Sequence, residues 1–214
     1  MKKILLASLL PLALAAYAAP DASLSKQSAF LRTLEKEAPQ TYQALNGSTL
    51  ADVYQAYRPQ LIQKLQQSSD ATFSKYANSF IKATEQLGQQ DPATCYAMLS
   101  SQQVPTLLEL QLALTSNTPY IDRVMKTLLT DAGGWQPPNL DSDADDAPLE
   151  QVITDLKADG HGEGLKYVFE GQKAENTAQM QAACNAAVAF FKALNRPSDA
   201  NRFIALRFML AVDS

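Results

Sequence analysis

The stretch AENTAQMQAACNAAVAFFKAL, residues 174–194, decides the fold of this chain. Within it, one set of residues recurs at alternating steps of four and three: Met180, Cys184, Ala187, Phe191 and Leu194. This spacing places the set along one face of an α-helix and is typical of a helix that packs lengthwise on another helix. The alanines permit a close approach between the two. The stretch therefore predicts a long, packed helix over residues 174–194.

Residues 70–87 give a second strong helical signal. Phe73, Tyr76 and Phe80 lie on one apolar stripe of this segment, at the spacing of an amphipathic helix. We expect Asp70 to cap the start of the helix and Gly88 to end it.

Prolines mark several other helix boundaries. Pro92, Pro105 and Pro119 each stand where a first helical residue is expected, a position that favours proline. Pro59, in contrast, falls inside an apolar helical pattern and is expected to break or kink the backbone there. Further helices are expected over residues 23–37, 39–45, 48–65, 148–158 and 163–169, and after residue 198.

Short connections between helices favour antiparallel neighbours, and alternation of β-branched residues is almost absent. The sequence therefore predicts an all-α fold, an irregular or orthogonal bundle of roughly eight to ten helices. We expect residues 19–214 to form a single α-helical domain, a size at which a sizeable core is readily buried. A repeat solenoid is the structural alternative. The two Tyr-Gln-Ala segments at 42–44 and 54–56 fit no usual helical-repeat period.

Residues 1–18 have the pattern of a secretory signal peptide. A basic start is followed by an apolar run over residues 4–15 and by small residues at Ala16 and Ala18, so cleavage is expected after Ala18. The apolar run is too short for a permanent membrane span, and no cysteine near the cleavage point offers a lipid anchor. We therefore expect a soluble periplasmic protein without a stable membrane anchor.

The charge balance argues against nucleic acid as a partner. The full chain has a net charge of −4, and removal of Lys2 and Lys3 with the leader changes this to −6. A nucleic-acid binder is expected to carry a clustered basic surface and an excess of positive charge.

Cys95 and Cys184 are the two cysteines of the chain. Because each lies on an apolar helical face of an exported protein, we expect a disulfide between them. The alternative is a pair of unpaired thiols in the core. A catalytic thiol is less favoured, because the one histidine, His161, lies far from both in sequence.

Residues 133–147 are the one long stretch without helical character, and we expect them to be mobile and to form part of the functional surface. Trp135 lies here, between two glycines and two prolines. Its large aromatic ring suits an anchor in a binding interface. The favoured interpretation is a lid that folds back on the core, with interface anchoring as the alternative.

The same segment holds Asp141, Asp143 and Asp145, a spacing that would present three carboxylates to one calcium ion. The calcium-loop pattern also needs glycine at its sixth position and glutamate at its twelfth, where this chain has Asp146 and Val152. A solvated acidic linker is therefore the favoured interpretation. Metal binding and docking of a basic partner are the alternatives.

Common catalytic motifs are absent from the sequence: it has no glycine-rich phosphate loop, no Gly-x-Ser-x-Gly elbow and no zinc-protease histidine pair. His161 lies beside Glu163 in a glycine-rich turn, but one histidine does not build a zinc site without several acidic partners. We interpret this turn as a helix terminator. No catalytic residue, metal site or cofactor is expected.

The favoured function is a non-enzymatic one, binding to another envelope or secreted protein, as an immunity protein or an accessory factor would do. The binding candidates are Trp135, Asp141, Asp143 and Asp145. A second hypothesis is a carrier with an apolar pocket between residues 107–112 and 203–210. A third is an enzyme that acts on a cell-wall or glycan substrate through paired carboxylates. The oligomeric state is left open.

Overall fold

The computed structural model describes residues 50–101, 104–114, 119–136 and 147–211, with four isolated positions at 35, 36, 39 and 43. These residues form helices and connections without a strand, so the all-α prediction is confirmed. The number of helices in the described ranges falls within the expected eight to ten. The helices are α3 Leu50–Gln67, α4 Asp70–Gln90, α5 Pro92–Leu99, α6 Leu107–Ala113, α7 Pro119–Thr130, α8 Ala147–Leu156, the π-helical turn η1 Lys157–His161, α9 Gly162–Val168, α10 Thr177–Leu194 and α11 Ala200–Ala211.

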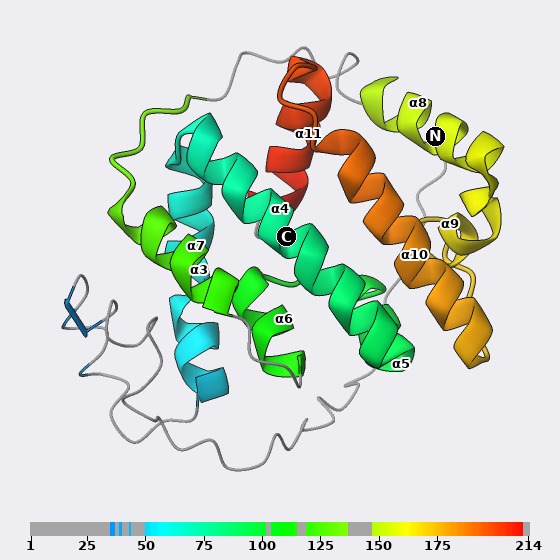
Figure 1. Ribbon diagram of the computed structural model, residues 1–214, viewed down its shortest axis with the longest axis horizontal. Coiled ribbons are helices and arrows are strands. Elements are labelled where there is room, and N and C mark those ends of the chain that lie inside the picture. The colour runs from blue at the N-terminus through cyan, green and yellow to red at the C-terminus, as the bar shows by residue number, and fades with distance from the viewer. Residues whose placement is uncertain are drawn as a thin grey trace, which may run out of the picture.

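Two long helices, α4 and α10, run side by side through the middle of the bundle (Figure 1). Phe80 of α4 meets Phe191 of α10 edge to face, with ring centroids 5.2 Å apart. Helices α6 and α7 pack on α4, α8 and α9 pack on α10, and α11 packs on α3. One hydrophobic cluster connects these helices. No helix in the described ranges combines the length and the apolar character needed to span a bilayer.

The apolar face predicted for residues 174–194 packs against the rest of the bundle in α10. Cys184, Ala187, Phe191 and Leu194 are buried, and Met180 is half-buried. Helices α9 and α10 approach closely at Gly164 of α9, where a Cβ atom would lie 2.1 Å from the carbonyl oxygen of Ala182. The small residues of α10 thus allow the close contact that the sequence indicated.

Cys95 and Cys184 form a disulfide between α5 and α10, as predicted. Their Cα atoms are 6.2 Å apart, within the usual range for a disulfide. Each cysteine is only 1% exposed. The bond therefore lies in the core and ties together segments 89 residues apart in the chain.

Several helix boundaries differ from the sequence expectation because other residues cap the helices. Ser69, not Asp70, is the N-cap of α4 and accepts a hydrogen bond from the Thr72 amide. The same helix continues past Gly88 to Gln90. Gly88 is buried there, and a Cβ atom at this position would lie 3.1 Å from that of Cys184. This glycine therefore serves helix packing and does not end the helix.

The proline predictions were right at Pro92, which follows the N-cap Asp91, and at Pro119, the first residue of α7. At Pro105 the prediction was wrong, because Thr106 caps α6 in a capping box with Glu109. Pro59 does not break α3, which runs on to Gln67.

The long helix α10 begins at Thr177, three residues later than predicted. Its N-cap is Asn176, whose side chain accepts a hydrogen bond from the Gln179 amide. The periodicity of the apolar residues does not mark this start, because the cap is a polar residue that lies outside the apolar face.

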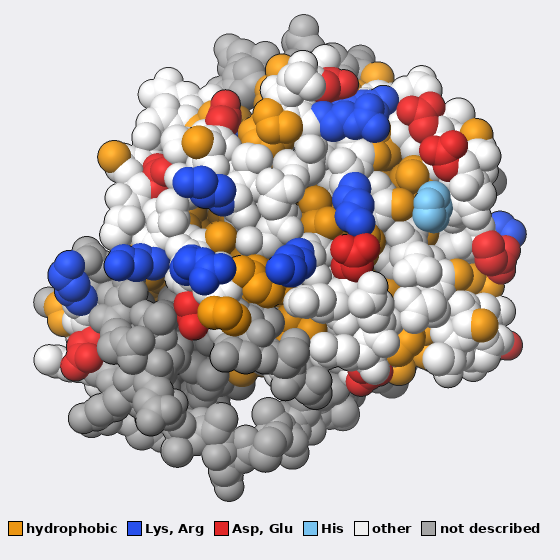
Figure 2. All heavy atoms as spheres, viewed as in Figure 1, with side chains coloured by type: hydrophobic (Ala, Val, Ile, Leu, Met, Phe, Trp, Pro, Cys, Tyr) orange, Lys and Arg blue, Asp and Glu red, His pale blue; other side chains and the backbone are white. Residues whose placement is uncertain are grey.

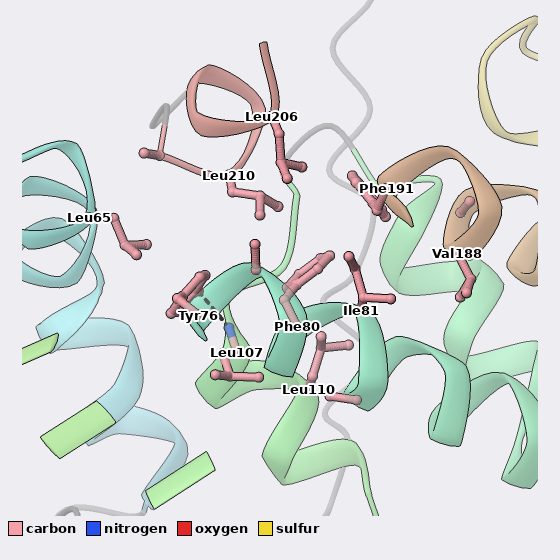
Figure 3. Close-up of a cluster of buried hydrophobic side chains, with 14 of the residues drawn as sticks. Leu65, Tyr76, Phe80, Ile81, Leu107, Leu110, Val188, Phe191, Leu206 and Leu210 are labelled. Carbon is pink, nitrogen blue, oxygen red and sulfur yellow. Dashed lines mark hydrogen bonds between the residues drawn. The ribbon is translucent and has the colours of Figure 1, made fainter. Parts of the chain in front are cut away.

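The core between α6 and α11 is filled by side chains of α4. In Figure 3, Tyr76 and Phe80 lie between Leu206 and Leu210 of α11 and Leu107 of α6. Tyr76 is 1% exposed, and its hydroxyl oxygen accepts a hydrogen bond of 3.0 Å from the Leu107 amide. Burial raises the pKa of this tyrosine well above its ordinary value.

Candidate binding surface around Trp135

The segment after α7 is hydrogen-bonded to the start of α4 through one carboxylate, that of Asp131. Oδ1 of Asp131 accepts hydrogen bonds from the amides of Ser69, at 3.2 Å, and Gly133, at 2.7 Å. Its Oδ2 accepts from the hydroxyls of Ser69, at 2.8 Å, and Thr72. The Thr72 hydroxyl, followed by the other donors, lowers the pKa of Asp131 to about 2. A carboxylate at a helix N-terminus also complements the helix dipole.

Two glycines then turn the chain toward the end of α3. Gly133 and Gly134 have φ angles of +79° and +117°, a region that residues with a side chain rarely adopt. The turn brings the amide of Trp135 within 3.3 Å of the carbonyl oxygen of Gln67, the last residue of α3. The Trp135 backbone is therefore held against a helix C-terminus that offers an unpaired carbonyl.

Arg207 of α11 lies beneath the Trp135 ring. It is 1% exposed, and its guanidinium carbon is 4.3 Å from the Phe73 ring centroid and 4.4 Å from that of Trp135. Nη1 donates to the carbonyl oxygens of Leu65 and Ser68, and Nη2 donates to Asp70 at 2.7 Å. Burial lowers the pKa of Arg207, while Asp70 opposes this shift. The arginine thus joins α3, α4 and α11 under the indole.

Trp135 and Phe208 form an aromatic pair at the surface. Their ring centroids are 6.3 Å apart in an edge-to-face arrangement. Phe208 is 38% exposed, and Trp135 is half-buried. The indole therefore covers Arg207, as a lid would, and its position beside Phe208 also places it at an apolar surface, as an interface anchor requires.

Asp141, Asp143 and Asp145 lie outside the described residues, so the acidic segment stays a prediction. Among the residues that the structure describes, no group of three or more histidine, cysteine, aspartate or glutamate side chains is arranged to hold a metal ion. His161 precedes α9 and makes no capping hydrogen bond with its side chain. Gly160 before it has a φ of +90°, the conformation of a turn that ends a helix.

Two observations concern the residues that the carrier and enzyme hypotheses involve. Tyr76 and Phe80 occupy the core between α6 and α11, where the carrier hypothesis places its pocket. Each described carboxyl group with a shifted pKa is shifted downward, namely Asp91, Asp131 and Glu163, and in each the largest cause is a hydrogen bond from a neighbouring hydroxyl.

Sequence reasoning missed Arg207, Phe208 and Asp131 as parts of this surface. The signal for Arg207 was a single cation inside the apolar run FIALRFML, residues 203–210. A charged residue in such a run is almost never fully buried unless it is paired. Its partners come from two distant segments, residues 65–73 and Trp135, and the sequence alone does not bring these together.

No protein-family model, no curated protein and no solved structure matches this chain. The function is therefore inferred from the geometry and chemistry of the residues themselves.

Proposed function

We propose that this protein is exported to the periplasm and binds another envelope or secreted protein, without enzymatic activity, through the surface formed by Trp135 and Phe208. The observation that carries the proposal is the aromatic pair itself, with Phe208 38% exposed beside a half-buried tryptophan. Binding hot spots are enriched in tryptophan, and the cores of protein interfaces are enriched in phenylalanine as well. An immunity protein or an accessory factor of an envelope machine fits this description.

The pair is already ordered before any partner arrives. The Trp135 amide is held by Gln67, and its ring lies on the fixed guanidinium of Arg207. Phe208 follows Arg207 directly in α11. Since a rigid aromatic surface loses little side-chain entropy on association, more of its interaction energy is expressed as affinity.

Export is supported by the leader pattern of residues 1–18 and is compatible with the buried disulfide. Terminal sequencing of the protein recovered from a periplasmic extract is expected to give Ala19 as the first residue. A first residue at Met1 in that extract would contradict the proposed cleavage.

The binding proposal is tested by photo-crosslinking in cells of the source organism. A benzophenone amino acid replaces Phe208 in one variant and Phe169 in a control variant. The two residues are matched because they are 38% and 39% exposed. We expect a discrete crosslinked protein from position 208 only. No adduct at 208, or the same adducts from both positions, would contradict the proposal.

A further inference from the structure

Lysine and arginine side chains gather in a row across α7 and α4 (Figure 2), although the chain as a whole is acidic. The basic residues of these two helices are Lys75 and Lys82 of α4 and Arg123 and Lys126 of α7, and all four are exposed. We call them the basic row.

The two helices run antiparallel, which aligns the four charges. At one end, the Tyr120 hydroxyl donates to Gln86 at 2.7 Å, and the Lys82 ammonium lies 4.3 Å from the Tyr120 ring centroid. At the other end, Asp131 bonds to Ser69 and Thr72, just before and inside the first turn of α4. Arg123 and Lys126, between these two ends, therefore run alongside the segment of α4 that holds Lys82 and Lys75.

The charges of the basic row are spaced along rigid backbone. Lys75 and Lys82 are two helical turns apart, about 10 Å along the helix axis. Arg123 and Lys126 are one turn apart on the same side of α7. Cations at these separations produce a positive potential that covers more of the surface than one cation would. Salt screens this potential beyond about one Debye length, roughly 8 Å at physiological ionic strength.

The acidic residues of α4 and α7 leave this field largely uncompensated. Asp70 is paired with Arg207, and Glu85 is paired with Lys192 at 2.9 Å. Asp122 is the remaining acid of the two helices. Within the described ranges, none of the four cations of the basic row forms an ion pair.

We propose that the basic row docks a carboxylate-rich segment of a partner protein. This inference rests on the proposed function in one respect, namely that the partner is a protein. The basic row adds the chemistry of the segment that it binds. A short acidic segment meets the row without contacting the rest of the surface. A long polyanion would extend past the row onto a molecule with a net charge of −4, where like charges repel it.

The test uses a synthetic peptide of alternating glutamate and serine, with a glutamine and serine peptide as the neutral control. Binding is followed by amide chemical shifts of the full-length mature protein. We expect shifts concentrated on α4 and α7 with the glutamate peptide only. We also expect the affinity to fall severalfold between about 20 and 150 mM salt, because the charges are exposed.

Two matched variants localise the binding. Arg123→Glu with Lys126→Glu removes half of the row and is expected to weaken peptide binding at least about fivefold. Lys157→Glu with Lys166→Glu is the control for net charge, since these side chains of η1 and α9 are 50% and 43% exposed and pair with the surface carboxylates of Glu170 and Glu163. It is expected to change the affinity less than about twofold. Circular dichroism checks that both variants fold.

Three results would overturn the proposal: no binding of the glutamate peptide, equal loss in the two double variants, or binding only to dextran sulfate or to phosphatidylglycerol vesicles. The last result would assign the row to a polyanion or a membrane. None of them bears on the crosslink at position 208, so failure of this proposal and failure of the proposed function are distinguishable.

Discussion

Arg207 shows how one buried cation organises the candidate surface. Its guanidinium contacts two aromatic rings and donates to backbone and carboxylate oxygens from α3 and α4. A buried charge of this kind persists only when it is paired and hydrogen-bonded. The position of Trp135 is therefore tied to the satisfaction of Arg207.

Trp135→Ala is expected to destabilise the protein by about 2 kcal/mol, between the effects typical of surface sites and of fully buried aromatics. The reason is that the half-buried indole both packs on Arg207 and shields it from water. Denaturant unfolding of the two forms measures the change. Trp135→Phe is the control and is expected to lose less. An unchanged midpoint and slope for Trp135→Ala would contradict the lid role.

Asp131 makes stability depend on pH in a defined range. Because its folded pKa is lowered to about 2 from 3.8, its contribution is fully present above pH 4 and is lost as the pH falls through 2. The difference in unfolding free energy between the wild type and Asp131→Asn is therefore expected to shrink from pH 5 to about pH 2. Urea unfolding across this range measures it. A difference that stays constant with pH would show that the carboxylate charge is unimportant.

At the scale of single residues, the sequence predicted the pairing of Cys95 with Cys184 because only two cysteines were present. The sequence did not decide between a lid and an interface anchor for Trp135, since the choice depends on which residue lies beneath the ring. The residue beneath it, Arg207, is 72 positions further along the chain. No local pattern encodes such a contact.

At the scale of helices, the apolar periodicities of α4 and α10 predicted both elements and their buried faces. Their ends were predicted less well, because capping depends on single polar residues such as Ser69 and Asn176. The close contact between α9 and α10 was not assigned to Gly164. From the sequence, that glycine was only part of the glycine-rich turn around His161, which was predicted to end a helix.

Gly164→Ala is expected to destabilise the protein by about 1–3 kcal/mol, the range typical of overpacked cores. A Cβ atom there would lie 2.1 Å from Ala182 O, so α9 and α10 must separate. Gly162→Ala in the same helix is the matched control, since its nearest neighbour is Lys157 Cγ at 3.7 Å. Thermal unfolding is expected to show a loss for the first variant only. Equal midpoints would contradict the close approach of these helices.

At the scale of the whole molecule, the helical composition predicted the fold class, while the arrangement around α4 and α10 emerged only from the structure (Figure 1). Helix order along the chain does not specify which faces meet. The disulfide is the one long-range constraint that the sequence predicted.

Reduction of the disulfide is expected to lower the free energy of unfolding by up to about 4.5 kcal/mol, the chain-entropy value for a loop of this length. The two cysteines are 89 residues apart, so the crosslink restricts a large part of the unfolded chain. Unfolding with and without reductant measures the loss, and thiol counting on the denatured, unreduced protein is expected to find no free thiol. Two free thiols would contradict the crosslink.

The central claim is that the surface of Trp135 and Phe208 binds a partner protein, and the affinity of Phe208→Ala for the crosslinked partner tests it most directly. We expect affinity to fall by a factor of about 30, equivalent to about 2 kcal/mol, as for an interface hot spot. The unfolding midpoint is expected to stay unchanged, and Phe169→Ala is expected to bind like the wild type. Unchanged affinity of Phe208→Ala, or equal losses in the two variants, would contradict the claim.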